Sequence, residues 1–349
     1  MTASIHDLQH PHQPLDTRGR PLHDLRISVM DRCNFRCPYC MPKERFHDNY
    51  RFLQSSERLS FAEIARLARV VAKLGVRKLR LTGGEPLLRV NLADLVGDLS
   101  AIPEIEDIAL TTNGVLLSRQ AVELAAHGLS RVTVSLDTLD PDLFHRMSGG
   151  HGTVSQVLEG IDAAIAAGLS PVKVNAVVER GVNDHCVLDL VEHFRGRPVI
   201  VRFIEFMDVG NRNAWRPEMV VPSRELVERI RARWPMQPLS QNYAGEVAKR
   251  WRLEDGSAEL GFISSVSQPF CGACSRARLS SEGRYYTCLF ATEGLDLRAA
   301  LRAGADDEQL LEVIRGKWMQ RTDRYSEQRE ELRGTHATQR KIEMYYIGG

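Results

Sequence analysis

Short runs of β-forming residues alternate with amphipathic stretches along the chain from residue 25 to about residue 205. The runs predict strands, and the stretches between them, often ended by a glycine such as Gly75, Gly128 or Gly168, predict helices. The six expected strands are residues 25–29, 78–81, 107–111, 131–135, 172–177 and 200–204. The expected helices include residues 61–74, 91–99, 119–126, 154–167 and 185–194.

Six strands that alternate with helices form βαβ units, so the sequence predicts an α/β fold with a parallel sheet. Six repeats, where a closed TIM barrel has eight, indicate an open partial barrel, although periodicity alone does not separate it from a doubly wound sheet. Beyond residue 205 the alternation fades. We therefore expect a barrel over residues 23–205 and a C-terminal region over residues 206–349 that closes its open side.

Residues 1–22 are polar and carry three prolines and several histidines. The histidines invite a metal-site interpretation, but their irregular spacing and the prolines favour a flexible N-terminal lead-in without chemistry. The histidines in and just after this segment are His6, His10, His12 and His23.

The charge of the whole chain is nearly balanced, with 46 Lys and Arg against 45 Asp and Glu. A net charge of +1 provides no global field for nucleic acid or an anionic membrane, so any anion site must be local. No apolar run approaches the ~20 residues that span a bilayer, and the N-terminus lacks the pattern of a signal peptide. We expect a cytoplasmic protein without nucleic-acid or membrane partners.

Six of the seven cysteines fall into two groups of three, and the seventh, Cys186, precedes an apolar stretch that favours a small buried residue. In a reducing compartment such thiols indicate metal binding rather than disulfides. The first trio is Cys33, Cys37 and Cys40, and the second trio is Cys271, Cys274 and Cys288.

The first trio follows the first expected strand directly, in the run Cys-Asn-Phe-Arg-Cys-Pro-Tyr-Cys. Three thiolates at this spacing can hold a four-iron cluster and leave one iron open to a substrate or cofactor. A zinc knuckle is the alternative, although a structural zinc site normally has four ligands. With Tyr39 before the last cysteine, the run resembles the C-x-x-x-C-x-aromatic-C motif of the radical S-adenosylmethionine (SAM) superfamily.

This resemblance implies a (β/α)6 partial barrel in which the open iron binds the methionine moiety of SAM. An electron from the cluster then cleaves SAM to a 5′-deoxyadenosyl radical. The turn Thr-Gly-Gly-Glu-Pro at residues 82–86 is a weak signal by itself, but after the second strand it resembles the motif that receives the SAM ammonium group. The SAM contacts that the resemblance implies are Tyr39, Gly84, Ser135 and Met207.

The second trio has the spacing C-x2-C-x13-C and contains Arg276 and Arg278. Zinc held by three cysteines and a histidine is the alternative, but no histidine lies between Lys249 and Cys288. This pattern resembles the GTP 3′,8-cyclase family of molybdenum cofactor biosynthesis. The resemblance implies two [4Fe–4S] clusters, SAM as cofactor, a homodimer, and a downstream cyclic pyranopterin monophosphate synthase that uses the product.

Basic residues recur on the expected strands. A parallel sheet covered by helices tends to be buried on both faces, so inward-pointing cations need an anion and would converge on one. Arginine forks match phosphate oxygens, and a triphosphate carries enough charge for four or five cations; separate salt bridges to local carboxylates are the alternative. These strand residues are Arg26, Lys78, Arg80, Lys173 and Arg202.

The resemblance gives these cations GTP as their ligand, with Thr111, Arg276 and Arg278 as further contacts. It implies that the radical takes hydrogen from C3′ of the ribose and that the resulting carbon radical attacks C8 of guanine, giving 3′,8-cyclo-7,8-dihydro-GTP. Such an attack needs positioning more than acid or base strength. Arg26, Arg276 and Arg278 are the candidates to stabilise the charge that develops afterwards.

The chain ends in Gly348 and Gly349, a tail that also matches the family. A frayed terminus is the ordinary interpretation, but two residues without side chains and a terminal carboxylate could thread into a narrow, cation-lined pocket. The resemblance implies this insertion, so both glycines are candidate catalytic residues.

Two other functions remain open from the residues. A radical SAM peptide-modifying enzyme with an auxiliary cluster would normally complete that cluster with cysteines, whereas an open trio beside arginines suits a small triphosphate. A nucleotide-binding iron–sulfur redox sensor without turnover is the second alternative, and the Gly-Gly-Glu-Pro turn argues against it.

Overall fold

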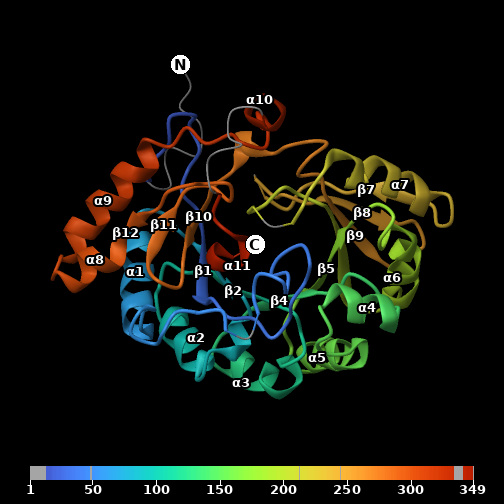
Figure 1. Cartoon of the computed structure of the whole chain (residues 1–349), viewed down its shortest axis with the longest axis horizontal. Coiled ribbons are helices and arrows are strands. Elements are labelled where there is room, and N and C mark those ends of the chain that lie inside the picture. Colours follow the sequence, from blue (N-terminus) through green and yellow to red (C-terminus); the bar gives the residue numbers. More distant parts are fainter. Residues whose placement is uncertain (1–12, 48, 212, 244, 334–340, 349) are drawn as a thin grey trace.

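The computed structural model describes residues 13–47, 49–211, 213–243, 245–333 and 341–348 (Figure 1). Its described strands form a single curved sheet in the order β12-β11-β10-β1-β2-β3-β4-β5-β6-β9-β8-β7. The six central strands are parallel to one another. They are β1 (Asp24–Met30), β2 (Lys78–Gly83), β3 (Asp107–Thr112), β4 (Arg131–Ser135), β5 (Val172–Val178) and β6 (Val199–Glu205).

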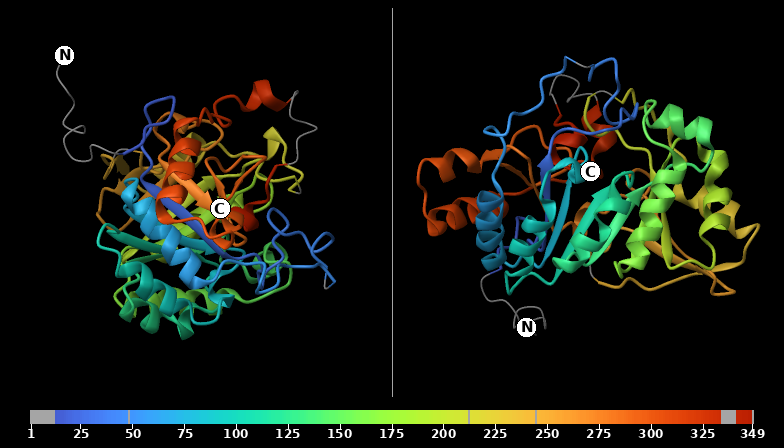
Figure 2. Two further views of the ribbon diagram at one scale, coloured as in Figure 1. Left: turned by 90° about the vertical axis from the view of Figure 1, so that its left-hand side faces the viewer. Right: turned by 90° about the horizontal axis from the view of Figure 1, so that it is seen from below.

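Helices cover the convex face of these strands, as Figures 1 and 2 show from three sides. This alternation confirms the α/β partial barrel, and each expected strand lies within one or two residues of the observed one. The helices of the barrel are α1 (Phe61–Lys73), α2 (Leu92–Ser100), α3 (Ala121–Ala126), α4 (Pro141–Met147), α5 (Val154–Ala166) and α6 (Val187–Phe194). Helix α4 was not expected from the sequence, although Asp140 as its N-cap and Pro141 at its first position are helix-start signals.

The C-terminal region joins the barrel at both of its edges. Strand β10 (Arg276–Leu279) pairs with β1, and β9 (Glu259–Ile263) pairs with β6, both in parallel. The remaining strands extend the two edges in antiparallel fashion: β7 (Met236–Pro238), β8 (Lys249–Leu253), β11 (Arg284–Tyr286) and β12 (Leu295–Asp296). The remaining helices are α7 (Ser223–Arg231), α8 (Leu297–Arg302), α9 (Asp307–Met319), α10 (Arg329–Arg333) and α11 (Met344–Ile347).

Alternation along β1 explains how the sheet separates core from site. Leu25 and Ile27 are buried and belong to the main hydrophobic core together with Leu67 of α1. Arg26 and Ser28 alternate with them, so they point to the concave face. Apolar side chains thus hold the helices on the outside, and polar side chains gather inside the curve.

The part of the lead-in that the structure describes, residues 13–22, is packed rather than flexible. Asp16 and Arg20 form a buried ion pair with 2.6 Å between Oδ2 and Nε, and Leu22 is fully buried. The indole Nε1 of Trp318 donates to the carbonyl of Arg20 at 3.0 Å. The expectation was wrong for these residues because their packing partners lie almost 300 positions away. Residues 1–12, which contain His6, His10 and His12, lie outside the described chain.

Among the described residues, none of the helices has both the length and the apolar character needed to cross a bilayer.

Candidate functional site

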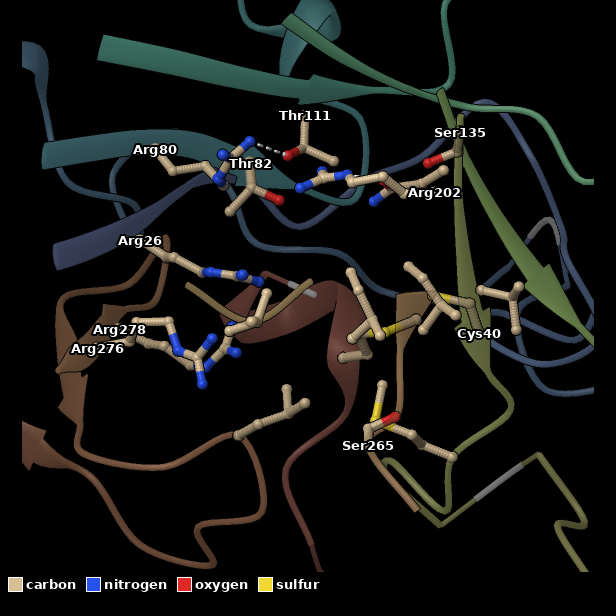
Figure 3. A pocket seen from close by; sticks show the side chains of 18 of the residues that line it. Arg26, Cys40, Arg80, Thr82, Thr111, Ser135, Arg202, Ser265, Arg276 and Arg278 are labelled. Carbon is tan, nitrogen blue, oxygen red and sulfur yellow. Dashed lines mark hydrogen bonds between the residues drawn. The ribbon is translucent and has the colours of Figure 1, made fainter. Parts of the chain in front are cut away.

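A single cavity on the concave face is lined by both cysteine trios and by the basic residues of the strands. Figure 3 shows Arg26, Arg80 and Arg202 reaching into it from the barrel strands. Arg276 and Arg278 reach in from β10. The structure therefore brings together residues that are up to about 250 positions apart in the sequence.

The first trio lies in the loop after β1, close to the Gly-Gly turn that ends β2. The backbone N–H of Gly84 donates to the carbonyl of Met30 at 2.7 Å, and that of Glu85 donates to the carbonyl of Arg32 at 2.7 Å. A Cβ at Gly84 would lie 2.2 Å from the Arg32 oxygen. This turn needs glycine because the cysteine loop passes directly against its backbone.

Glu85 is buried and anchors the turn. Its carboxylate accepts hydrogen bonds from the Thr112 hydroxyl at 2.7 Å, the Asn113 backbone N–H at 2.8 Å and the Leu87 backbone N–H at 3.0 Å. Burial nevertheless raises the pKa of Glu85 to about 7. The carboxylate thus links the ends of β2 and β3 beneath the first trio.

The four residues expected to contact SAM all line the cavity, and two of them, Tyr39 and Gly84, lie in or against the loop of the first trio. The Tyr39 hydroxyl donates to Asp137 Oδ2 at 2.7 Å, and Asp137 Oδ1 accepts from the Val177 backbone N–H at 2.8 Å. Burial raises the pKa of Asp137 to about 6. Asp137 was not predicted from the sequence, although a carboxylate just past the C-terminal end of a parallel strand is a recognisable signal. The four expected residues are Tyr39, Gly84, Ser135 and Met207.

Backbone and side-chain N–H groups point at the sulfurs of the first trio. The N–H of Phe35 lies 3.3 Å from Cys33 Sγ, and Asn113 Nδ2 lies 3.9 Å from the same sulfur. Burial raises the pKa of all three thiols, that of Cys33 to about 12. Thiolates in this loop therefore need positive charge close by, which the irons of a cluster provide.

The second trio is surrounded by arginines. Cys274 Sγ accepts from Arg276 Nη2 at 3.4 Å and from Arg321 Nη2 at 3.2 Å. Burial alone would raise the pKa of Cys274, but these two guanidinium groups lower it to about 6. The N–H of Phe290 donates to Cys288 Sγ at 3.4 Å. Arg321 was missed because it lies far downstream of the trio.

Both trios offer three soft sulfur donors beside a cavity, with N–H donors to the sulfur, and this chemistry fits one iron–sulfur cluster each. Within the described residues, no three His, Cys, Asp or Glu side chains are arranged to hold one metal ion. A cluster distributes its ligands over separate irons, so its thiolates stand further apart than the ligands of a single ion.

The strand cations lie at matching levels of the sheet. Arg26 of β1 is in register with Arg80 of β2 on one side and with Arg278 of β10 on the other. Arg80 Nη1 donates to the Thr111 hydroxyl at 3.0 Å, and Arg202 Nε donates to Asn175 Oδ1 at 2.9 Å. The described residues contain no carboxylate within ion-pair distance of Arg26, Arg80, Lys173, Arg202 or Arg278.

This arrangement is electrostatically unfavourable without an anion. Burial, together with the neighbouring cations, lowers the pKa of Arg26 well below its usual value. The same causes lower the pKa of Arg80 to about 10, that of Arg202 to about 9 and that of Lys173 to about 7. Burial and the charge of Arg276 lower the pKa of Arg278 to about 10. A bound polyanion would relieve this repulsion, so these side chains are suited to bind one.

Two further basic residues line the same cavity but have partners. Lys78 Nζ lies 3.5 Å from the centre of the Tyr243 ring, which is a cation–π distance. Arg131, which was not expected in the cavity from the sequence, pairs with Asp107 at 2.8 Å between Nε and Oδ1. Its charge still contributes to the field at Arg80 and Lys173.

The C-terminal tail lies inside the curve of the sheet, where Figure 1 shows α11 and the end of the chain. The carbonyl oxygen of Gly348 accepts a hydrogen bond from Arg278 Nη1. Gly348 has a φ of +71°, and a Cβ at this position would lie 2.0 Å from Thr82 Cγ2. Glycine is therefore required at this position against the cavity residues Thr82 and Arg278. Gly349 lies outside the described residues.

Comparisons with known proteins agree with this geometry. Residues 27–194 match the Radical SAM superfamily, and residues 199–327 match the family Molybdenum Cofactor Synthesis C. The fold is similar to that of Streptococcus suis SuiB in its crystal structure with S-adenosylmethionine bound, with a TM-score of 0.60 at 16% identity over 85% of this chain and 69% of SuiB. This likeness shows the fold alone.

Sequence similarity to several enzymes covers nearly the whole chain. GTP 3′,8-cyclase of Xanthomonas campestris pv. campestris (strain B100) is 56% identical over 96% of this chain and 97% of the relative. The enzymes of the same name from Acidothermus cellulolyticus and Staphylococcus aureus (strain Mu3) are 51% and 48% identical, over 97% and 96% of this chain and 99% and 98% of the relatives. These similarities show that the chain belongs to the GTP 3′,8-cyclase family, a radical SAM family of molybdenum cofactor biosynthesis.

Proposed function

We propose that this chain converts GTP to (8S)-3′,8-cyclo-7,8-dihydroguanosine 5′-triphosphate, the first step of molybdenum cofactor biosynthesis. The observation that carries this proposal is the shared cavity, in which two three-cysteine sites flank a set of buried cations. One end of the cavity offers a place for SAM and the other a place for the nucleotide, so both ligands can meet without leaving the protein.

The first trio would hold one [4Fe–4S] cluster, and Tyr39, Gly84, Ser135 and Met207 would hold SAM beside it. When bound, this pair supplies the 5′-deoxyadenosyl radical that takes hydrogen from C3′ of the ribose. The protein itself contributes by positioning SAM. Asp137 fixes the Tyr39 hydroxyl, and Glu85 fixes the glycine turn, so the walls around SAM are set before it binds.

The strand cations would hold the triphosphate, and the second trio with its cluster would hold the guanine ring. Arg26, Arg80 and Lys173 face the same space and lack carboxylate partners among the described residues, so three phosphates can neutralise them. Lys78, Thr111 and Arg202 border the same space. Arg276 and Arg278 lie between the phosphates and the second trio, where a guanidinium can stabilise charge that develops during cyclisation.

The same cations favour a nucleotide over a peptide substrate. A peptide-modifying radical SAM enzyme has no need for several unpaired cations in its cavity, and most peptide segments could not neutralise them. A redox sensor that binds nucleotide without turnover would need no SAM pocket beside the first trio.

An anaerobic assay separates these three functions. Protein reconstituted with iron and sulfide would be incubated with SAM, dithionite and GTP, ATP or CTP. The expected result is cyclised product and 5′-deoxyadenosine with GTP, and little product with the other nucleotides. SAM cleavage without a cyclised nucleotide, or no SAM cleavage at all, would contradict the proposed function.

We also propose a homodimer, a cyclic pyranopterin monophosphate synthase as the downstream user of the product, and a cytoplasmic location. The family resemblance supports the first two. Six cysteines committed to two oxygen-sensitive sites support a reducing compartment such as the cytoplasm.

Changing Arg276 or Arg278 to Ala should lower the rate of cyclisation on the order of a hundredfold while both clusters stay in place. Losing one preorganised charged contact typically costs this factor. Product formation and iron content would be measured on the same samples. Arg315→Ala is a matched control, because Arg315 pairs only with Glu312 on the exposed face of α9 within the described structure. Full activity of both cavity variants would contradict the assignment.

The affinity for GTP should fall as the pH rises above about 7. The pKa of Lys173 is about 7 without nucleotide, and phosphate oxygens beside the ammonium group raise it on binding. Binding therefore takes up a proton. The affinity is highest below pH 7 and falls by up to about tenfold per pH unit until the pH reaches the pKa of Lys173 in the bound state.

Anaerobic calorimetry between pH 7.5 and 9 in buffers of different ionisation enthalpy would measure this proton uptake. The Lys173→Met variant should bind GTP more weakly and lose this part of the pH dependence. An affinity that stays constant over this range in the unmodified protein would refute the role of Lys173.

A further inference from the structure

A buried carboxylate outside the cavity lining joins three parts of the molecule. Asp208 directly follows Met207 and is only 8% exposed. Its Oδ1 accepts from Arg329 Nε at 2.8 Å, and its Oδ2 accepts from the Tyr325 hydroxyl at 2.5 Å and from Lys341 Nζ at 2.9 Å. We define Asp208, Tyr325, Arg329 and Lys341 as the Asp208 clasp.

The clasp is held by charge. Burial raises the pKa of Asp208, but the cations of Arg329 and Lys341 and the Tyr325 hydroxyl lower it overall, so the carboxylate is ionised. Arg329 is also buried and has no other ion pair among the described residues, although its Nη1 donates to the Ser265 carbonyl at 3.0 Å. Removing the carboxylate would leave a buried cation without its anion.

One arm of the clasp reaches the second trio. The Tyr325 ring stacks on Phe290, with 4.3 Å between the ring centres and 21° between the planes. Phe290 follows Cys288 by two positions, and its N–H donates to the Cys288 sulfur at 3.4 Å. The position of Asp208 is thus coupled by direct contacts to the loop of the second trio.

The other arm fixes the start of the C-terminal tail. Lys341 Nζ donates to both the carboxylate and the carbonyl oxygen of Asp208. Asn211 reinforces this contact, since its Nδ2 donates to the Lys341 carbonyl at 2.6 Å and its Oδ1 accepts from the Lys341 N–H at 3.0 Å. From this anchor the chain runs through α11, which packs against β1 and β2, to Gly348, whose carbonyl accepts from the cavity residue Arg278.

We propose that Asp208 is a positioning residue for cyclisation, which anchors the tail through Lys341 and ties this anchor to the second trio through Tyr325. With its start fixed, the tail does not have to search for the cavity, and Gly348 reaches Arg278 at a high effective concentration. This inference rests on the proposed function and adds to it that the tail completes the cyclisation site through the contact of Gly348 with Arg278.

Hydrogen exchange on protein loaded with both clusters tests the anchor without any turnover. Asp208→Asn and Lys341→Met should each accelerate exchange of residues 341–348 by about tenfold or more. A hydrogen bond to a charged group typically shifts the equilibrium between anchored and released tail by at least this factor. Exchange in β1–β6 should stay as it is in the unmodified protein. Asp255→Asn is the matched control, since Asp255 forms an exposed ion pair with Arg195.

Peptide rescue tests what the anchor is for. In the clasp variants the ratio of cyclised product to cleaved SAM should fall about tenfold, and an added peptide with the sequence of residues 342–349 should restore part of it. If Asp208→Asn does not fold, Tyr325→Phe, which removes only one hydroxyl, replaces it in both measurements. A purely structural role would lower stability while the ratio and tail exchange stay unchanged, and that result would overturn the inference.

The two proposals can fail separately. If the unmodified protein forms no cyclised GTP, the proposed function fails, but tail exchange in the clasp variants still decides whether Asp208 anchors the tail. Faster exchange without any change in the product ratio would overturn the role in cyclisation.

Discussion

Replacing Cys33, Cys37 and Cys40 by Ala is expected to remove one of two clusters and to abolish reductive cleavage of SAM. These residues are the only described cysteines beside the SAM part of the cavity, and N–H groups already point at Cys33 Sγ. Without them no iron remains next to SAM. The iron content should fall from about eight to about four atoms per chain, the value for a single four-iron cluster.

Iron and sulfide analysis, electron paramagnetic resonance and chromatography of 5′-deoxyadenosine would measure these effects. Cys186→Ala is the matched control, because Cys186 is buried, lies outside the cavity lining and contacts the Thr138 hydroxyl at 3.3 Å. It should keep both clusters and the full rate of SAM cleavage. Zinc instead of iron in both trios after anaerobic purification would contradict the assignment.

The corresponding triple variant of the second trio should show that the two ends of the cavity have separate functions. Loss of Cys271, Cys274 and Cys288 removes the second cluster but leaves the first trio and the SAM-contact residues untouched. SAM cleavage should therefore continue without cyclisation. Loss of SAM cleavage in this variant, with the first cluster intact, would show that the two ends do not act independently.

The local signals in the sequence were sufficient for the barrel, for both cysteine trios and for most of the basic strand residues that line the cavity. Strand alternation places Arg26 and Arg80 on the same face, and parallel register then brings them to the same level. The cysteine motifs were recognisable because their spacing is local. In each of these cases the residues that matter lie on one element or directly after it.

Residues whose role depends on distant partners were not predictable in the same way. Arg321 contacts Cys274, and Tyr325 contacts Asp208, each across a large separation in the sequence. Asp16 appears in a polar, proline-rich segment, yet it is buried with Arg20 against the region of the second trio. Composition alone cannot show such packing, because a segment is ordered by partners that the local sequence does not contain.

The sequence also does not show whether a basic side chain has an ion-pair partner. Arg80 of β2 and Arg131 of β4 are both in register with Ala109 of β3, but Arg131 pairs with Asp107, whereas no carboxylate pairs with Arg80 in the described chain. Only the side-chain geometry separates a structural ion pair from a cation that is available to a ligand.

Gly348→Ala is expected to abolish cyclisation while both clusters and the fold remain. The added methyl group would lie 2.0 Å from Thr82 Cγ2, and the φ of +71° is one that alanine adopts only with strain. The tail must therefore leave its place, and the Gly348 carbonyl loses its hydrogen bond from Arg278. Product formation, SAM cleavage and iron content measured on one sample would separate loss of cyclisation from loss of a cluster.

Gly316→Ala is the matched control, because Gly316 lies in α9 and a Cβ there meets nothing within 4 Å. Alanine should leave activity unchanged and stabilise the helix by about 1 kcal/mol. Deletion of Gly348 and Gly349 should have the same effect as Gly348→Ala, and an added peptide that ends in Gly-Gly should restore part of the activity, since the tether is lost but the binding contacts are not. In the described chain, only Gly348 places a backbone carbonyl on Arg278. A truncated enzyme that cyclises GTP at the full rate would therefore show that this contact is not needed and that the tail is an ordinary chain end.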